Sequence, residues 1–177
     1  MEILAAALGV LMALVTCMAA ETPGQDLDEY QVKAAFLYNF ARFVEWPAEA
    51  FRGPGEPFSI CILGEDPFGR ALDGMVAGKA VGGRPIAVLR ISGANQIDGC
   101  HILFVSSPAS KRVLSILTTA KRIGVLTVGD AGTAENVIIG FVMESGKVRF
   151  EINTAAADRA VLHISAKLLS LARAIKR

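Results

Sequence analysis

One early segment of the chain has its hydrophobic residues three or four positions apart, which is the spacing of one face of a helix. The segment covers residues 26–47, and Asp26 or Asp28 is placed to cap its start. Pro47 ends it, and Trp46, the only tryptophan, lies at this boundary. The pattern predicts an amphipathic helix whose apolar face consists of Val32, Phe36, Phe40, Phe43 and Val44.

Farther along, short apolar runs rich in β-branched residues alternate with segments of helical spacing. Runs of this length are typical of buried strands, and helices between them are typical of crossover connections. The alternation therefore predicts a mainly parallel sheet. The expected strands cover residues 58–64, 85–91, 101–106 and 123–130, and the expected helices between them cover residues 66–76 and 107–122.

The pattern changes near the C-terminus. Two apolar runs, residues 137–144 and 147–153, are joined by Ser145-Gly146, which is a hairpin signal. Residues 155–177 keep helical spacing and predict one long terminal helix. Together these elements predict an α/β fold, a three-layer sandwich with a mainly parallel sheet, an antiparallel C-terminal hairpin and helices on both faces.

The N-terminus has the layout of a secretory signal. Residues 3–20 are uncharged and almost wholly apolar, they end in the small residues Ala19 and Ala20, and a polar stretch follows. We expect a cleaved signal peptide at residues 1–20, a flexible N-terminal segment at 21–28, and a single domain at 29–177. Two alternatives stay open, an uncleaved membrane anchor and a lipoprotein attached through Cys17 in "LVTC".

Removal of the signal changes both the charge and the cysteine count. The mature chain has 157 residues (177 − 20) and a net charge of +2, from 18 basic and 16 acidic residues once Glu2 is gone. This charge argues against a nucleic-acid partner. Two cysteines remain, Cys61 and Cys100, and an even count in an exported protein favours a disulfide.

The neighbouring pair Cys100-His101 also allows a catalytic thiol or a metal ligand. Adjacent residues of a strand point to opposite faces, so the two side chains do not meet easily in a strand. The chain has no CxxC, HxH or HExxH spacing, no complete phosphate-binding loop and no carboxylate pair spaced for acid–base work. The sequence therefore predicts a binding protein without enzymatic activity, metal or cofactor.

Several motifs in order resemble one known family. They are "YQVKAAFLYNFARFVEWP", "CILGEDPFG", "GKAVGGRPIAV", "CHILFVS", "LTVGD", "KVRFEIN" and "ISAKLLSLAR". Together they are similar to the YfiR-like family of periplasmic proteins, over about residues 29–173. The helix that ends in Val-Glu-Trp-Pro, the Arg-Phe-Glu-Ile-Asn strand and the Leu-Leu-x-Leu-Ala-Arg segment are the most specific of these motifs.

The resemblance implies a periplasmic repressor that binds the periplasmic region of an inner-membrane diguanylate cyclase. Such a protein lowers cyclic-di-GMP and biofilm formation, forms homodimers, and in some systems is sequestered by an OmpA-like outer-membrane lipoprotein. Cys61 and Cys100 match the family's positions for an intramolecular disulfide, and they lie in or beside strands expected to be neighbours. The alternative is a binding module of the same fold for another membrane sensor or a small ligand.

Three residues are candidates for partner binding. Trp46 and Pro47 lie where the first helix gives way to a turn, and the alternative for Trp46 is that it fills the core. Asp130 ends a predicted strand, at the carboxyl edge of the sheet where ligands favour binding. Asn136-Val137 stands where the family usually has a Gly-Gly pair, and the preceding "AGT" lacks the family's aromatic residue. We therefore expect the loop after Asp130 to differ from that of the relatives, and the partner to differ as well if partner contacts use this loop.

Overall fold

The computed structural model describes residues 23–106, 123–130 and 137–177. The predicted signal peptide and the helix predicted over residues 107–122 lie outside the described residues. Helix α1 (Pro23–Phe43) begins inside the segment 21–28 that the sequence predicts to be flexible. Proline suits the first turn of a helix, which is consistent with this earlier start. No helix within the described ranges is long and apolar enough to span a membrane.

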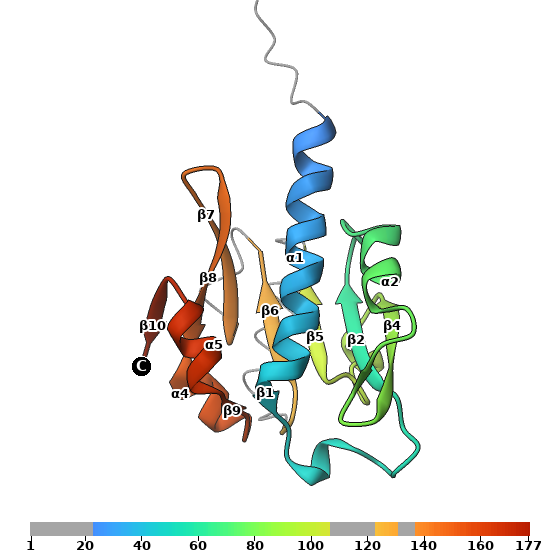
Figure 1. The fold of residues 1–177 in the computed structure, drawn as a ribbon. Coiled ribbons are helices and arrows are strands. Elements are labelled where there is room, and N and C mark those ends of the chain that lie inside the picture. The colour runs from blue at the N-terminus through green and yellow to red at the C-terminus, as the bar shows by residue number, and fades with distance from the viewer. Residues whose placement is uncertain (1–22, 107–122, 131–136) are drawn as a thin grey trace, which may run out of the picture.

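Eight strands form one sheet in the order β10-β8-β7-β6-β5-β2-β4-β3 (Figure 1). Neighbours from β4 to β7 run parallel, β7 and β8 form an antiparallel hairpin, and β10 returns parallel to β8. The predicted parallel strands and the predicted hairpin are confirmed, whereas the edge strands β3 and β10 were not predicted. The strands are β2 (Phe58–Leu63), β3 (Ala80–Val81), β4 (Arg84–Ile91), β5 (Ile102–Val105), β6 (Leu126–Gly129), β7 (Ile139–Glu144), β8 (Lys147–Asn153) and β10 (Ala174–Lys176).

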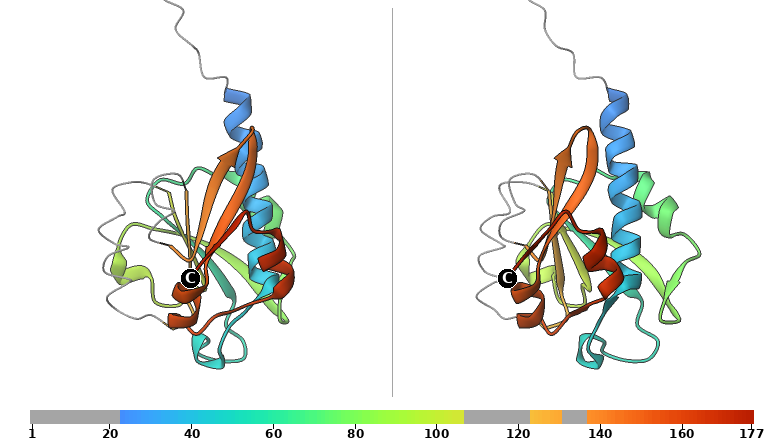
Figure 2. Two further views of the ribbon diagram at one scale, coloured as in Figure 1. Left: turned by 90° about the vertical axis from the view of Figure 1, so that its left-hand side faces the viewer. Right: turned by 60° about the vertical axis from the view of Figure 1, so that its left-hand side comes forward.

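Both faces of the sheet are buried, as the predicted three-layer architecture requires. Helix α1 crosses one face, with α2 (Arg70–Val76) beside it (Figure 1). Ile60 and Ile62 of β2 belong to the core cluster that contains α1, while Leu63 belongs to a second cluster on the other face. Segment 92–100, which includes the short helix η2 (Ala94–Gln96), lies on that second face (Figure 2). Because successive side chains of β2 point to opposite faces of the sheet, this strand contributes residues to both core clusters.

The apolar face of α1 is rotated from the predicted one. Phe40 and Val44 are buried as expected and Phe36 and Phe43 partly so, but Val32 is exposed. Apolar residues surround most of this helix, so its spacing did not fix a single face. The buried stripe consists of Ala34, Leu37, Phe40, Ala41 and Val44.

Aromatic side chains of α1 pack against aromatic side chains of the C-terminal hairpin. Phe40 packs on Phe141 and Phe150 with ring centroids 5.8 and 5.2 Å away. At the turn, Ser145 and Gly146 both have positive φ, 50° and 71°, as a two-residue hairpin turn requires. The predicted hairpin is confirmed, and it projects beside α1 (Figure 2).

The long terminal helix predicted over residues 155–177 is wrong. The tail divides into α4 (Thr154–Arg159), β9 (His163–Ile164), α5 (Ala166–Leu171) and β10. Val161 has a φ of 57°, outside the helical region, and it separates α4 from β9. Strand pairing overrides the helical spacing here, because β9 pairs with β1 (Val44–Glu45) and β10 adds an edge to β8.

Candidate functional site

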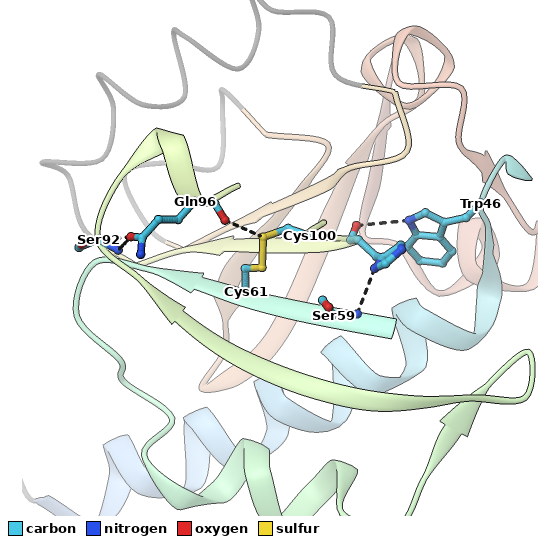
Figure 3. Close-up of a disulfide and its surroundings, with 7 residues drawn as sticks. Trp46, Ser59, Cys61, Ser92, Gln96 and Cys100 are labelled. Carbon is cyan, nitrogen blue, oxygen red and sulfur yellow. Dashed lines mark hydrogen bonds between the residues drawn. A yellow bond between two sulfur atoms is a disulfide. The ribbon is translucent and has the colours of Figure 1, made fainter. Parts of the chain in front are cut away.

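Cys61 and Cys100 are joined by a disulfide (Figure 3). Cys61 lies on β2 and Cys100 lies two residues before β5, the parallel neighbour of β2, so their Cα atoms are 5.8 Å apart. This distance is in the ordinary range for a disulfide. The exposed fractions of the two residues are 0% and 4%, which places the bond in the second core cluster. Cys100 therefore supplies no free thiol, and the pairing agrees with the one that the resemblance implies.

His101 follows the disulfide directly, and its side chain is completely buried. Its Nδ1 accepts a hydrogen bond from the backbone N–H of Ser59 at 3.0 Å. Its ring stacks between Phe51 and Phe58, with centroid distances of 4.4 and 4.9 Å. The sequence indicated a polar residue at the entrance of a strand. The position is right, since β5 begins at Ile102, but the aromatic enclosure was not predicted.

Trp46 lies next to this histidine and is half-buried. Its indole N–H donates to the backbone carbonyl of His101 at 3.3 Å (Figure 3). Its ring meets Phe58 edge to face at a centroid distance of 4.8 Å. Trp46 thus packs against the first core cluster and keeps part of its ring exposed. The interpretation as a core residue agrees with this packing, and the role of Trp46 in partner binding stays a prediction.

Pro47 starts the turn that covers this end of the sheet. It precedes the short helix η1 (Ala48–Ala50), and its carbonyl accepts a hydrogen bond from the Ala50 N–H at 3.0 Å. Gly124, just before β6, lies directly beneath. A Cβ on Gly124 would come 2.4 Å from the Cβ of Ala50, and the residue has a φ of +74°, so only glycine fits there.

Asp130 lies at the other end of the parallel strands, directly after β6, where it holds a buried lysine. Both carboxylate oxygens accept hydrogen bonds from Lys33 Nζ, at 2.8 and 2.7 Å, and one also accepts from the Tyr30 hydroxyl at 2.8 Å. Lys33 is 1% exposed, and it also pairs with Glu29 one turn earlier on α1. We call Glu29, Tyr30, Lys33 and Asp130 the Lys33 cluster. It ties α1 to the carboxyl edge of the sheet.

A signal for this cluster was present in the sequence. Lys33 lies four, seven and eight residues before the buried positions Leu37, Phe40 and Ala41 of α1, on the same stripe. A lysine on a buried stripe needs a charged partner, because an unpaired buried charge is very costly. The spacing could have predicted that Lys33 is paired, but it could not name Asp130, 97 residues away.

The structure does not bring the three predicted contact residues together. Trp46 and Pro47 lie near the amino ends of β2 and β5, whereas Asp130 follows the carboxyl end of β6, which runs in the same direction. Most of the loop after Asp130, including Asn136, lies outside the described residues; Val137 is described and is buried. Within the described ranges, no group of three His, Cys, Asp or Glu side chains could hold a metal ion.

The chain was compared with protein families, curated proteins and solved structures. No curated protein matches it in sequence. Among solved structures it is similar to one described as the ABC domain in complex with L-Trp from Streptococcus pneumonia, with a TM-score of 0.46 and 13% identity over 67% of this chain. The match spans little more than half, 56%, of that protein's chain. The sequence profile of a family described as YfiR/HmsC-like matches residues 30–173, most of the chain. The protein therefore belongs to the YfiR/HmsC-like family.

Proposed function

We propose that this protein represses an inner-membrane diguanylate cyclase by direct contact in the periplasm, and so lowers cyclic-di-GMP and biofilm formation. The family match over residues 30–173 carries the proposal, because YfiR/HmsC-like proteins are periplasmic regulators of diguanylate cyclase signalling. The signal-like segment at residues 1–20 supports export, with cleavage releasing the domain. An OmpA-like outer-membrane lipoprotein as a second partner and a homodimeric state are parts of the same proposal.

The proposed mechanism is binding without turnover. A repressor of this kind favours one conformation of the cyclase's periplasmic region over another. Its effect on the cyclase cannot exceed the ratio of its affinities for the two conformations. The chemistry around His101 is compatible with a binding role, since the neighbouring Cys100 sulfur is bonded to Cys61 and the imidazole is enclosed by aromatic rings.

We place the partner contact at Trp46 and Pro47. Trp46 is half-buried, Ala48 and Glu49 shortly after it in the chain are exposed, and aromatic side chains are frequent anchors of interfaces. The packing of the Trp46 ring on Phe58 holds it in one orientation, which lowers the entropy cost of binding. Asp130 contributes differently. Because it is held by Lys33 and Tyr30, we assign it to fixing α1 against the end of β6.

The disulfide would keep the binding surface preformed. It joins β2 to the start of β5, and the residue after Cys100 carries the carbonyl that Trp46 binds. Loss of the bond would lower the folded population, and with it the amount of active repressor.

Gene deletion followed by complementation tests the proposal. We expect the deletion to raise cyclic-di-GMP and surface attachment, and the wild-type gene to restore both. A Trp46→Phe variant keeps the aromatic packing but loses the indole contact area, and it should restore repression only in part at wild-type abundance. Glu144→Gln, on the exposed part of the C-terminal hairpin, is the control and should restore it fully. Unchanged cyclic-di-GMP in the deletion strain, with the cognate cyclase expressed, would defeat the proposal.

A further inference from the structure

His101 is the central member of a stack whose residues come from four segments of the chain. Phe51 covers one side of its ring and Phe58 the other, with interplanar angles of 25° and 24°. The Arg84 guanidinium lies over the outer face of Phe51, 4.0 Å from the ring centroid, and Trp46 closes the far end against Phe58. We call Arg84, Phe51, His101, Phe58 and Trp46 the aromatic column.

The hydrogen bonds of His101 define its neutral form. Its Nδ1 accepts the Ser59 N–H, so the ring proton resides on Nε2. That Nε2 atom is buried and has no hydrogen-bond partner among the described residues. A second proton can be added only at Nδ1, where it would face another donor, the Ser59 N–H. The folded structure therefore has no place for the protonated ring unless the ring or β2 moves.

The charged groups around the ring do not offset its burial. Desolvation lowers the pKa of His101 first and foremost, and the Arg84 charge lowers it further; the Glu56 carboxylate and the Ala50 carbonyl raise it. Arg52 lies with Glu56 beside Gly99, so a positive charge accompanies that carboxylate. From the sheet, β2 contributes Ser59 and β6 contributes the Leu126 N–H, which bonds to the His101 carbonyl, and neither is charged.

Segment 46–57 is the part of the enclosure that can open. It contains η1, which has no buried residues, and it covers the imidazole with Phe51. Its hold on the sheet includes the Trp46 hydrogen bond to the His101 carbonyl and two bonds from Arg84 Nη1, to the carbonyls of Gly53 and Glu56 at 2.8 Å each. Segments with few buried side chains open at the lowest free energy.

We propose that His101 is a pH-sensitive switch, whose protonation in mildly acidic medium opens the aromatic column and releases segment 46–57 from the sheet. The sign follows from the lowered pKa. The contribution of the neutral ring to stability is complete above the ordinary histidine pKa, about 6.5. It is lost as the pH falls from there through the pKa of the folded state. This inference does not depend on the proposed function.

The direct test is a pH titration of the wild-type protein followed by two signals. The chain has two histidines, so NMR of the histidine rings resolves both, and a His163→Asn variant assigns them. Trp46 is the only tryptophan, so its fluorescence reports on the end of the column. We expect the His101 signal to titrate below the ordinary histidine value, and Trp46 emission to shift to longer wavelength with the same midpoint. A His101 titration at the ordinary value, or Trp46 emission that stays constant while His101 protonates, would overturn the proposal.

A variant tests the energetics separately. His101→Asn keeps an acceptor for Ser59 near the position of Nδ1 but does not titrate, and the exposed His163→Asn is the matched control. Below about pH 6.5, the unfolding constants of the wild type and of the control should rise more steeply with falling pH than the unfolding constant of His101→Asn. The difference between these slopes should reach up to about a factor of ten per pH unit. Equal slopes for His101→Asn and wild type contradict the switch. If His101→Asn does not fold, the wild-type titration alone decides.

Discussion

Lys33→Met should destabilise the protein strongly, because the substitution removes the only cation that the Lys33 cluster contains. Lys33 is 1% exposed, and the side chain of Asp130 is 13% exposed, so the carboxylate stays largely out of water when the lysine is gone. Breaking one side of a buried ion pair typically costs about 3–5 kcal/mol. We expect about 3 kcal/mol, at the lower end, since the Tyr30 hydroxyl still donates to Asp130.

A double-mutant cycle separates the ion pair from other effects of the substitution. Methionine keeps most of the volume of lysine, so little of the loss should come from packing. Adding Asp130→Asn to Lys33→Met removes the carboxylate charge that Lys33 balanced and should recover about 2 kcal/mol. Lys147→Met, at an exposed position on β8, is the control and should change stability by less than about 0.5 kcal/mol.

Urea unfolding read by Trp46 fluorescence gives these free energies, provided that the m-value stays the same across the variants. A loss below about 1 kcal/mol for Lys33→Met, or a coupling energy near zero with Asp130→Asn, would refute the reasoning. In that case the contacts at 2.7 and 2.8 Å would not stabilise the junction of α1 with the carboxyl edge of the sheet.

Three further predictions concern the other end of the parallel strands. Gly124→Ala should lower the free energy of unfolding by at least about 2 kcal/mol, because residue 124 has a φ of +74° and a Cβ there clashes with Ala50. Adding Ala50→Gly should recover only the part of the loss that comes from the clash. A Gly124→Ala variant as stable as the wild type would contradict the backbone conformation at this position. Cys61→Ser with Cys100→Ser should cost about 4 kcal/mol, as expected for opening a loop of 39 residues; full repression by this variant at wild-type abundance would show that the disulfide has only a structural role. Trp46→Ala should lower the free energy of unfolding by about 2–3 kcal/mol and also weaken partner binding, since the ring is half-buried; unchanged melting together with unchanged binding would exclude both roles.

The sequence predicted those parts of the fold in which local pattern and tertiary structure agree. Each strand from β2 to β8 that it predicted lies within two or three residues of the observed element, because a buried strand needs an unbroken apolar run. The hairpin at Ser145-Gly146 was predictable, because its turn needs a positive φ at two successive positions and few residue types adopt a positive φ.

The sequence could not predict the C-terminal tail, where two levels of structure conflict. Asn153 and Ser165 each cap the start of a short helix, accepting from the N–H groups of Ala156 and Leu168. The caps were visible in the sequence, yet the continuous helical spacing favoured one long helix. Helices this short depend on tertiary contacts for their stability, and the partners of β9 and β10 lie far away in the sequence.

The functional sites, like the fold, were predictable from the sequence only in part. The signal-like N-terminus and the even cysteine count of the mature chain are enough to favour a disulfide. The aromatic column could not be predicted, since Phe51, Phe58 and His101 come from separate segments and only the register of β2 with β5 brings them together. Asp130 was identified by its place after a strand, but its partner Lys33 lies on a helix at the opposite end of the chain.

The most direct test of direct-contact repression is a reconstituted cyclase assay. A full-length membrane diguanylate cyclase from the same organism, chosen as the candidate partner, would be placed in lipid vesicles with its periplasmic region outward and its catalytic domain supplied with GTP on the inside. Mature protein with the Cys61–Cys100 bond intact is then titrated from outside. Repression by contact predicts a saturable fall in cyclic-di-GMP synthesis, weaker for Trp46→Phe and unchanged for Glu144→Gln. Constant synthesis at saturating concentrations of folded protein would contradict the account.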